Sequence, residues 1–381
     1  MKQKIPFNKI YLTGNEISYI KKALKNDHLS GDGFFTEKTQ KTIQNFTGCP
    51  KVLLTHSCTA ALEMSALILN IKEGDEVIMP SFTFTSTANA ICLRGGIPVF
   101  VDIRKDTLNI DETLIEKSIT KKTKAIVVVH YAGVACEMDV VMKIARKYKL
   151  SVIEDAAQAY GAKYKNKSLG TIGDLGCFSF HESKNIICGE GGALLINKPK
   201  FYLAAEIYRE KGTDRTKFLR GEINKYSWKN IGSSYLPGET TAAFLLAQIE
   251  KATWINNQRL KIWDYYHKKL FKLEKDGLIT RPFVPDVCIH NAHIYYILVS
   301  KKLDRNLILR ELKSFGINAV FHYIPLDSSF AGKAYGKTLG VLNNTKETAS
   351  HIIRLPIWIG LNKKTQDFII DHLESILKIN S

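Results

Sequence analysis

Between residues 50 and 200 the chain alternates short apolar runs, rich in Val and Ile, with amphipathic stretches. The predicted strands are 51–54, 76–79, 98–101, 125–129 and 151–154, and the predicted helices between them are 60–69, 86–94 and 139–148. Strands that are apolar on both faces and alternate with helices are typical of a mainly parallel sheet covered on both sides. Ligands of such α/β sheets bind beyond the carboxyl ends of the strands. We therefore expect a functional site in the loops after Leu54, Met79, Glu154 and Phe180.

The C-terminal part of the chain has a different pattern. Residues 240–273 predict one long helix, which is followed by predicted strands at 293–299 and 317–321 and a final amphipathic helix at 365–379. This order predicts a smaller α+β unit joined through the long helix. We place a large domain at 1–245 and the long helix with a small domain at 246–381, and we regard the N-terminal segment as a candidate to pack on the small domain.

The composition is that of an ordinary globular protein, with 45% hydrophobic and 24% charged residues. No apolar run approaches the ~18 residues that span a bilayer, and no apolar secretion signal is visible. Seven scattered cysteines without metal-ligand spacing predict reduced thiols and no metal site. The net charge of +17 comes from dispersed lysines, which favours a solvated surface over a track for nucleic acid. We expect a cytoplasmic protein without a membrane or nucleic-acid partner.

Two strand ends carry the residues that a pyridoxal-phosphate (PLP) enzyme needs. PLP requires a lysine for a Schiff base, a carboxylate beside the pyridine nitrogen, a flat group against the ring and a cradle for the phosphate. Lys184 follows the run 177–180 and precedes the glycines of 189–192, although a surface lysine would give the same local pattern. Asp155 ends the strand 151–154 and could keep the ring nitrogen protonated, although such an aspartate is as often a helix N-cap.

Two further loops offer the remaining groups. Ser57 and Thr59 stand where a strand meets a helix, and the free N–H groups of a helix start bind phosphate. Capping alone would explain the same residues. Phe84 follows the next strand and could stack on a ring or be buried in the core, and Gln158 could reach the ring hydroxyl. Each signal leaves its alternative open, but their joint order after strands of one sheet favours a PLP site.

With these motifs in place, the chain resembles the sugar aminotransferases of the DegT/DnrJ/EryC1/StrS family, within fold-type I PLP enzymes, along nearly its whole length. The segments that carry the resemblance are 51–55, 58–64, 130–139, 178–181, 226–228, 231–235 and 321–325. Within the family the chain is most similar to the dTDP-4-amino-4,6-dideoxygalactose transaminases, and the segments 130–139 and 231–235 carry that narrower likeness.

The resemblance implies roles for individual residues. Lys184 would form the Schiff base and Asp155 would pair with the pyridinium. Phe84 would stack on the ring and Gln158 would approach the ring oxygen. The implied phosphate contacts are Cys58, Thr59, Ser179 and, across a homodimer interface with shared active sites, Ser234 of the partner subunit. The chain departs from the wider family at His56, at Ser234, where most members have Asn, and at 236–239.

The implied reaction transfers the amino group of L-glutamate to a dTDP-4-keto-6-deoxyhexose, giving dTDP-4-amino-4,6-dideoxygalactose and 2-oxoglutarate for surface-polysaccharide or lipopolysaccharide synthesis. The same chemistry could instead give the C4 epimer or act at C3. A dehydratase of the same fold would carry histidine in place of Lys184, so the presence of the lysine disfavours dehydratase activity. A non-catalytic basic binding protein is the remaining alternative, and the intact Lys184, Asp155 and phosphate loop favour an enzyme.

Overall fold

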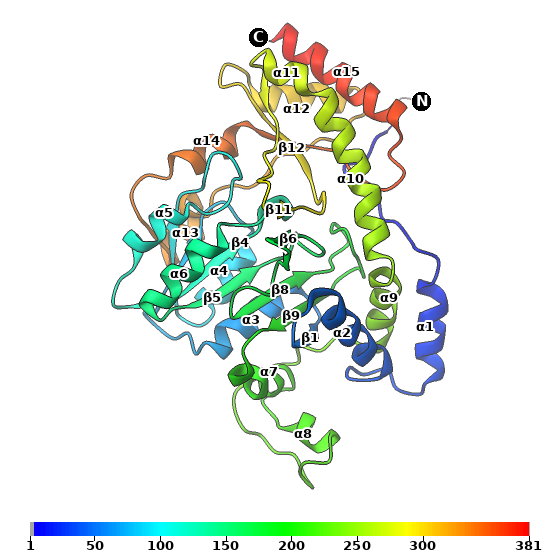
Figure 1. Ribbon diagram of the computed structural model, residues 1–381, viewed down its shortest axis with the longest axis vertical. Helices are drawn as coiled ribbons and strands as arrows, with labels where there is room; N and C mark the ends of the chain where they lie inside the picture. The colour runs from blue at the N-terminus through cyan, green and yellow to red at the C-terminus, as the bar shows by residue number, and fades with distance from the viewer. Residues whose placement is uncertain (1–3, 381) are drawn as a thin grey trace.

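The computed structural model describes residues 4–380 and confirms the α/β architecture around a mainly parallel sheet (Figure 1). Its eight strands lie in the order β1-β9-β8-β5-β4-β2-β3-β13. Their bounds are β1 (Lys51–Thr55), β2 (Glu76–Pro80), β3 (Ile97–Val101), β4 (Thr123–Val129), β5 (Ser151–Asp155), β8 (Leu175–Ser179), β9 (Gly192–Ile196) and β13 (Lys337–Thr338). Neighbouring strands are parallel, except that β9 is antiparallel to both β1 and β8. The strands predicted between residues 50 and 155 are all present.

Helices cover both faces of this sheet because successive side chains of a strand point to opposite faces. In β1, Val52 and Leu54 belong to one buried cluster, and Leu53 belongs to the other. The first cluster includes side chains of α1 (Glu16–Lys25), α2 (Phe34–Thr47), α6 (Met138–Tyr148) and α9 (Glu239–Ile249). The second includes side chains of α3 (Cys58–Ile68), α4 (Thr85–Cys92) and α7 (Tyr202–Arg209). Burial on both faces explains why the strands are apolar throughout.

A third buried cluster packs among elements of the C-terminal part of the chain, which lie toward the top of Figure 1. Its antiparallel sheet consists of β10 (Ile279–Thr280), β12 (Tyr295–Val299) and β14 (Ile352–Leu355). The cluster also includes side chains of α10 (Ala252–Lys269), α11 (Phe271–Lys275), α12 (Arg305–Ser314) and α15 (Lys363–Ile379). Ile5 joins it and forms a bridge with Ile317. The predicted domain boundary at residue 245 falls within α9 and stays a prediction.

The remaining elements are short. A third sheet consists of β6 (Lys163–Tyr164), β7 (Lys167–Ser168) and β11 (Cys288–Ile289). The other helices are α5 (Glu112–Ile115), α8 (Arg215–Leu219), α13 (Phe330–Tyr335), α14 (Asn343–His351) and the 3₁₀ turns η1 (Glu116–Ser118), η2 (Tyr131–Gly133), η3 (Pro199–Phe201) and η4 (Leu326–Ser328). In Figure 1, α8 and the loops beside it project from the bottom of the molecule.

Two predicted elements are wrong. The single long helix at 240–273 is three helices. The first, α9, ends at Ile249, and the Lys251 N–H bonds to the oxygen of Gln248, three residues back, so the α-helical pattern is interrupted before α10 begins. A second interruption at Leu270 separates α10 from α11. The predicted strand at 317–321 forms only isolated bridges. The Asn318 N–H bonds to Ile5 and the Val320 N–H bonds to Arg354, so the segment has no single partner strand.

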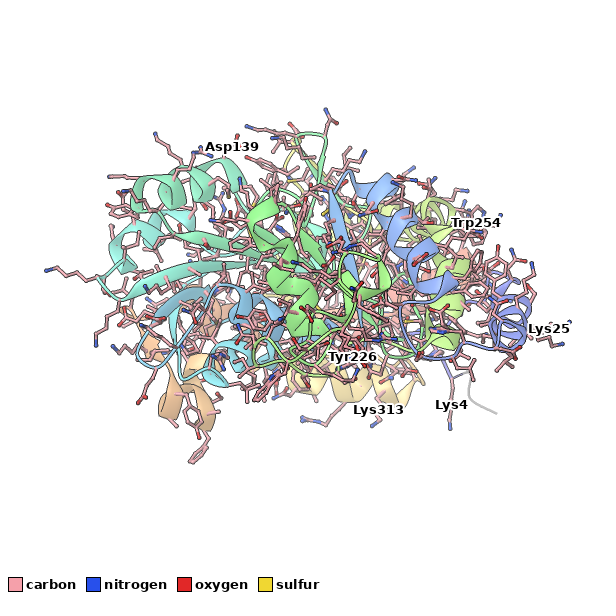
Figure 2. All side chains as sticks on the ribbon, turned by 90° about the horizontal axis from the view of Figure 1, so that it is seen from below. Lys4, Lys25, Asp139, Tyr226, Trp254 and Lys313 are labelled. Atoms are coloured by element: carbon pink, nitrogen blue, oxygen red, sulfur yellow. The ribbon has the colours of Figure 1, made fainter. Side chains whose placement is uncertain are left out.

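Charge is spread over the surface. In Figure 2 the labelled Lys4, Lys25 and Lys313 point outward from different parts of the molecule. Within residues 4–380, no helix is both long enough and apolar enough to cross a membrane.

Candidate functional site

The carboxyl ends of the parallel strands open into a cavity of about 470 Å³. The predicted site residues that line it are Cys58, Thr59, Phe84, Asp155, Gln158, Ser179 and Lys184. Ser234 does not line it: this residue is exposed, and its backbone forms a bridge with Glu210 next to α7. The structure therefore brings together the site residues that follow strands, and places Ser234 elsewhere on the same chain.

The start of α3 forms one wall of the cavity. The Ser57 hydroxyl is used as the N-cap, accepting the N–H of Ala60 at 3.0 Å. The N–H groups of Cys58 and Thr59 belong to the first turn, which a helix leaves without internal partners. Burial raises the pKa of the Cys58 thiol well above its usual value, so the thiol stays neutral. The wall thus offers neutral donors at a helix start, which suits an anion.

Glycine is required where β9 passes this wall. A Cβ at Gly192 would lie 2.4 Å from the carbonyl carbon of Ser57 and 2.5 Å from the nitrogen of Cys58. Both contacts are with backbone, which cannot swing away as a side chain could. The glycine cluster after Lys184 therefore lets a strand approach the start of α3 closely.

Asp155 is buried at the carboxyl end of β5, on the floor of the cavity. Its Oδ2 accepts the Thr87 hydroxyl at 2.7 Å, and its Oδ1 accepts the Ala157 N–H at 3.2 Å. Burial raises the pKa of Asp155, against the opposing effect of these hydrogen bonds and of the positive charge on Lys184. No Lys, Arg or His of residues 4–380 forms an ion pair with this carboxylate, so it lacks a direct counter-charge.

Lys184 lies in the loop after β8, and its side chain is only partly exposed. Its N–H bonds to the oxygen of His181 at 2.9 Å, which folds the loop back toward the cavity. Burial lowers the pKa of Lys184, and the charge of Arg354 lowers it further. A lysine whose pKa is lowered by burial in a cleft has the properties of a nucleophile or base.

Gln158 and Phe84 both line the cavity. The Gln158 side chain accepts the Ala132 N–H at 2.7 Å and donates to the Tyr323 hydroxyl at 2.9 Å, so the orientation of its amide is fixed. Phe84 is the N-cap residue of α4 and is 61% exposed, which excludes the alternative of a core phenylalanine. An exposed ring at a cavity wall is available for stacking.

The sequence analysis missed several residues of the cavity wall. Tyr323 and His322 follow the C-terminal unit's segment 317–321, and Arg354 lies on β14. Thr87 of α4, which hydrogen-bonds Asp155 without lining the cavity, was missed as well. A charged residue inside an otherwise apolar strand was a visible signal for Arg354. Tyr323 lies within the segment 321–325, which carried the family resemblance, but nothing in its local pattern indicated which side chain would face the cavity. Groups of three His, Cys, Asp or Glu side chains able to hold a metal ion do not occur in the described part of the chain.

His56 and the stretch 236–239, two of the departures from the family pattern, make contacts that connect distant parts of the chain. The His56 N–H bonds to the oxygen of Tyr235, and the two rings are 6.1 Å apart. Further along, the buried carboxylate of Glu239 accepts the N–H groups of Gly33, Phe35 and Thr36. The stretch 236–239 thus fastens the N-terminus of α2, whose own N-cap residue, Gly33, has no side chain to do so.

Comparisons with known proteins show which family the chain belongs to. The uncharacterized protein MJ1066 of Methanocaldococcus jannaschii is 38% identical over 96% of this chain and 95% of its own length. GDP-perosamine synthase of Caulobacter vibrioides is 30% identical, covering 96% of each chain. Spr1654 of Streptococcus pneumoniae, solved in its PLP form, is 26% identical over 100% of both chains with a TM-score of 0.91. Residues 11–374 match the DegT/DnrJ/EryC1/StrS aminotransferase family, and the chain belongs to this family of enzymes.

Proposed function

We propose that this PLP-dependent sugar aminotransferase moves the amino group of L-glutamate to the keto group of a nucleotide-linked 4-keto-6-deoxyhexose. The observation that carries the proposal is the placement of Lys184, Asp155 and the start of α3 around one cavity. The PLP form of the similar Spr1654 supports the choice of cofactor. We place the reaction in the cytoplasm.

The cavity residues fit the cofactor. Asp155 is a buried carboxylate without an ion-pair partner among residues 4–380, and a protonated pyridine nitrogen would supply the missing charge. The start of α3, with Thr59 and Ser179, suits the phosphate, and Phe84 suits the face of the ring. When bound, PLP supplies an electron sink that stabilises negative charge on the carbon bearing the amino group.

The chain's own residues then have separate tasks. Lys184 Nζ would hold the cofactor at rest, and as a free amine it would take the proton from the α-carbon of the amino donor. Burial favours the neutral form of Nζ, which is the form able to accept a proton. Thr87 orients the Asp155 carboxylate through Oδ2. Gln158 and Tyr323 form a hydrogen-bonded pair in the cavity and would approach the ring oxygen.

For the sugar substrate we propose a dTDP-4-keto-6-deoxyhexose and a product with the galacto configuration at C4, from the segments 130–139 and 231–235. A GDP-linked sugar is a second candidate, because GDP-perosamine synthase is 30% identical to this chain. The test offers dTDP-4-keto-6-deoxyglucose or GDP-4-keto-6-deoxymannose, each with L-glutamate, and identifies the products by NMR. An axial amine at C4 of the dTDP sugar supports the proposal. The equatorial epimer, amination at C3, turnover of the GDP sugar alone, or no amine from either would contradict it.

We also propose a homodimer in which Ser234 of the partner subunit contacts the phosphate. Within residues 4–380, α3 contributes only neutral donors to the cavity wall, and a dianion calls for further contacts. The segment before Ser234 exposes large apolar side chains, with Trp228 79% and Ile231 49% exposed. Such side chains on a projecting arm suit burial against a second copy.

Mixing experiments test the shared site. Lys184→Ala protein mixed with Ser234→Glu protein should recover activity through hybrid dimers, in which one site is intact. Random exchange of equal amounts rebuilds about a quarter of all sites. The matched control mixes Lys184→Ala with Asp155→Ala, because these residues line the same cavity of one chain and no intact site can form. No recovery in the first mixture, under conditions where subunits exchange, would contradict the shared site.

A further inference from the structure

Among residues 4–380, three lysine or arginine side chains line the cavity, and they differ in which acceptors their N–H groups already bind. Lys184 is assigned to the cofactor. Arg259, on α10, is buried and donates to the backbone oxygens of Ala292, His293 and Ile357 at 3.1, 2.6 and 3.3 Å. Its guanidinium therefore links the segment before β12 to the segment after β14. Arg354 is the remaining cation.

Most N–H donors of Arg354 have no acceptor among residues 4–380. Its Nε and Nη2 both donate to a single acceptor, the oxygen of Phe321, at 3.2 and 3.0 Å. An arginine has five N–H donors in a fixed plane, so this contact leaves most of them available. The guanidinium lies 4.7 Å from the centre of the Phe7 ring, and this contact restrains the orientation of the guanidinium plane. No carboxylate within residues 4–380 forms an ion pair with it.

The position of this charge favours an anionic ligand. Burial lowers the pKa of Arg354, which means that the surroundings disfavour its charge. A partly buried charge without an ion-pair partner is stabilised when an anion enters beside it. The charge of Arg354 also lowers the pKa of Lys184 and of His322, so the guanidinium and these groups share one electrostatic environment. An anion held at Arg354 would lie in the same cavity as Lys184.

The proposed reaction brings two kinds of anion into the cavity, the carboxylates of the amino donor and the diphosphate of the sugar. The donor must present its amino nitrogen at Lys184, and a carboxylate on the same small molecule has to find a cation nearby. The planar fork of an arginine matches a carboxylate with two parallel hydrogen bonds. We propose that Arg354 binds a carboxylate of the amino donor. This inference rests on the proposed function, since it presumes a carboxylate-bearing donor.

The test measures binding of two probes to PLP-loaded enzyme by calorimetry. Glutarate represents the donor's carboxylates, and dTDP represents the sugar's diphosphate. Arg354→Met should weaken glutarate binding by roughly tenfold to a hundredfold, the loss expected when hydrogen bonds to a charged group are removed, and should leave dTDP binding unchanged. Arg354→Lys should retain part of the glutarate affinity, because it keeps the charge but loses the fork. The lysine variant also serves if the methionine variant does not fold.

The matched control is Arg305→Met. Arg305 also lies against an aromatic ring, 5.4 Å from the centre of Phe321, and donates to backbone oxygens, but it does not line the cavity. This control should bind both probes as the wild type does. Unchanged glutarate binding in Arg354→Met, or an equal loss of dTDP binding, overturns the inference. Failure of the wild type to consume glutamate would instead count against the proposed function, because the glutarate comparison between variants can be made without turnover.

Discussion

Replacing Glu239 by alanine tests how the beginning of α9 secures α2. The carboxylate is 1% exposed and accepts the N–H groups of Phe35 at 2.7 Å, Thr36 at 3.0 Å and Gly33 at 3.2 Å, together with the Thr36 hydroxyl at 2.5 Å. These N–H groups belong to the start of α2, where the helix supplies no acceptors of its own. Alanine leaves them without partners, at ~1–3 kcal/mol for each buried donor. Because water can enter the space and satisfy some of them, we expect a total loss of about 3–5 kcal/mol.

The assay is equilibrium unfolding in urea, followed by fluorescence and circular dichroism. The matched control is Glu37→Ala, which removes an exposed carboxylate from the first turn of the same helix. That change affects only the interaction with the helix dipole, about 0.3–1 kcal/mol. If Glu239→Ala lowers the free energy of unfolding no more than Glu37→Ala does, the buried carboxylate is not what holds α2, and our reading of the stretch 236–239 is wrong.

Three other predictions concern the cavity and the acid stability of the fold. Asp155→Asn should keep the cofactor but lose at least about a hundredfold in kcat, because a neutral side chain cannot keep the ring nitrogen protonated. Near-normal kinetics would mean that Asp155 only stabilises the local turn through its hydrogen bond with the Ala157 N–H. Gly192→Ala should weaken PLP binding in an equilibrium titration, since the new Cβ meets backbone at 2.4 Å, and an unchanged affinity would place the phosphate elsewhere. Burial raises the pKa of Glu16, but the hydrogen bonds from Thr13 and Gln248 lower it by more, so that the pKa lies below its ordinary value of 4.5. Its ionised form therefore contributes stability above pH 4.5 that is lost as the pH falls through the lowered pKa, and Glu16→Gln should flatten this acid limb of the unfolding curve.

Much of the candidate site could be predicted because its residues follow strands of a parallel sheet. Asp155 and Phe84 each follow a strand that the apolar pattern identifies, and parallel strands bring their carboxyl ends to one edge. The pattern could not decide between capping and ligand binding at the start of α3. In the structure Ser57 caps the helix while Cys58 and Thr59, the next two residues, line the cavity, so the two alternatives apply to neighbouring residues.

The rest of the site depends on contacts between distant parts of the chain. Arg354 and Tyr323 reach the cavity from the C-terminal unit, and Phe7 reaches it from the N-terminal segment. Local periodicity carries no information on such an approach. The same limit explains the wrong elements: the break near Lys251 has no glycine or proline to mark it, and the segment 317–321 alternates like a strand but bonds to two different partners.

The most direct test of the account is to find where the cofactor is attached. Purified enzyme loaded with PLP is reduced with borohydride, digested and mapped by mass spectrometry. We predict that the pyridoxyl mass lies on Lys184, in the peptide that contains 178–184, and that Lys184→Ala folds normally but has no turnover. A label on any other lysine, or full activity in Lys184→Ala, would contradict the assignment of this cavity as the active site.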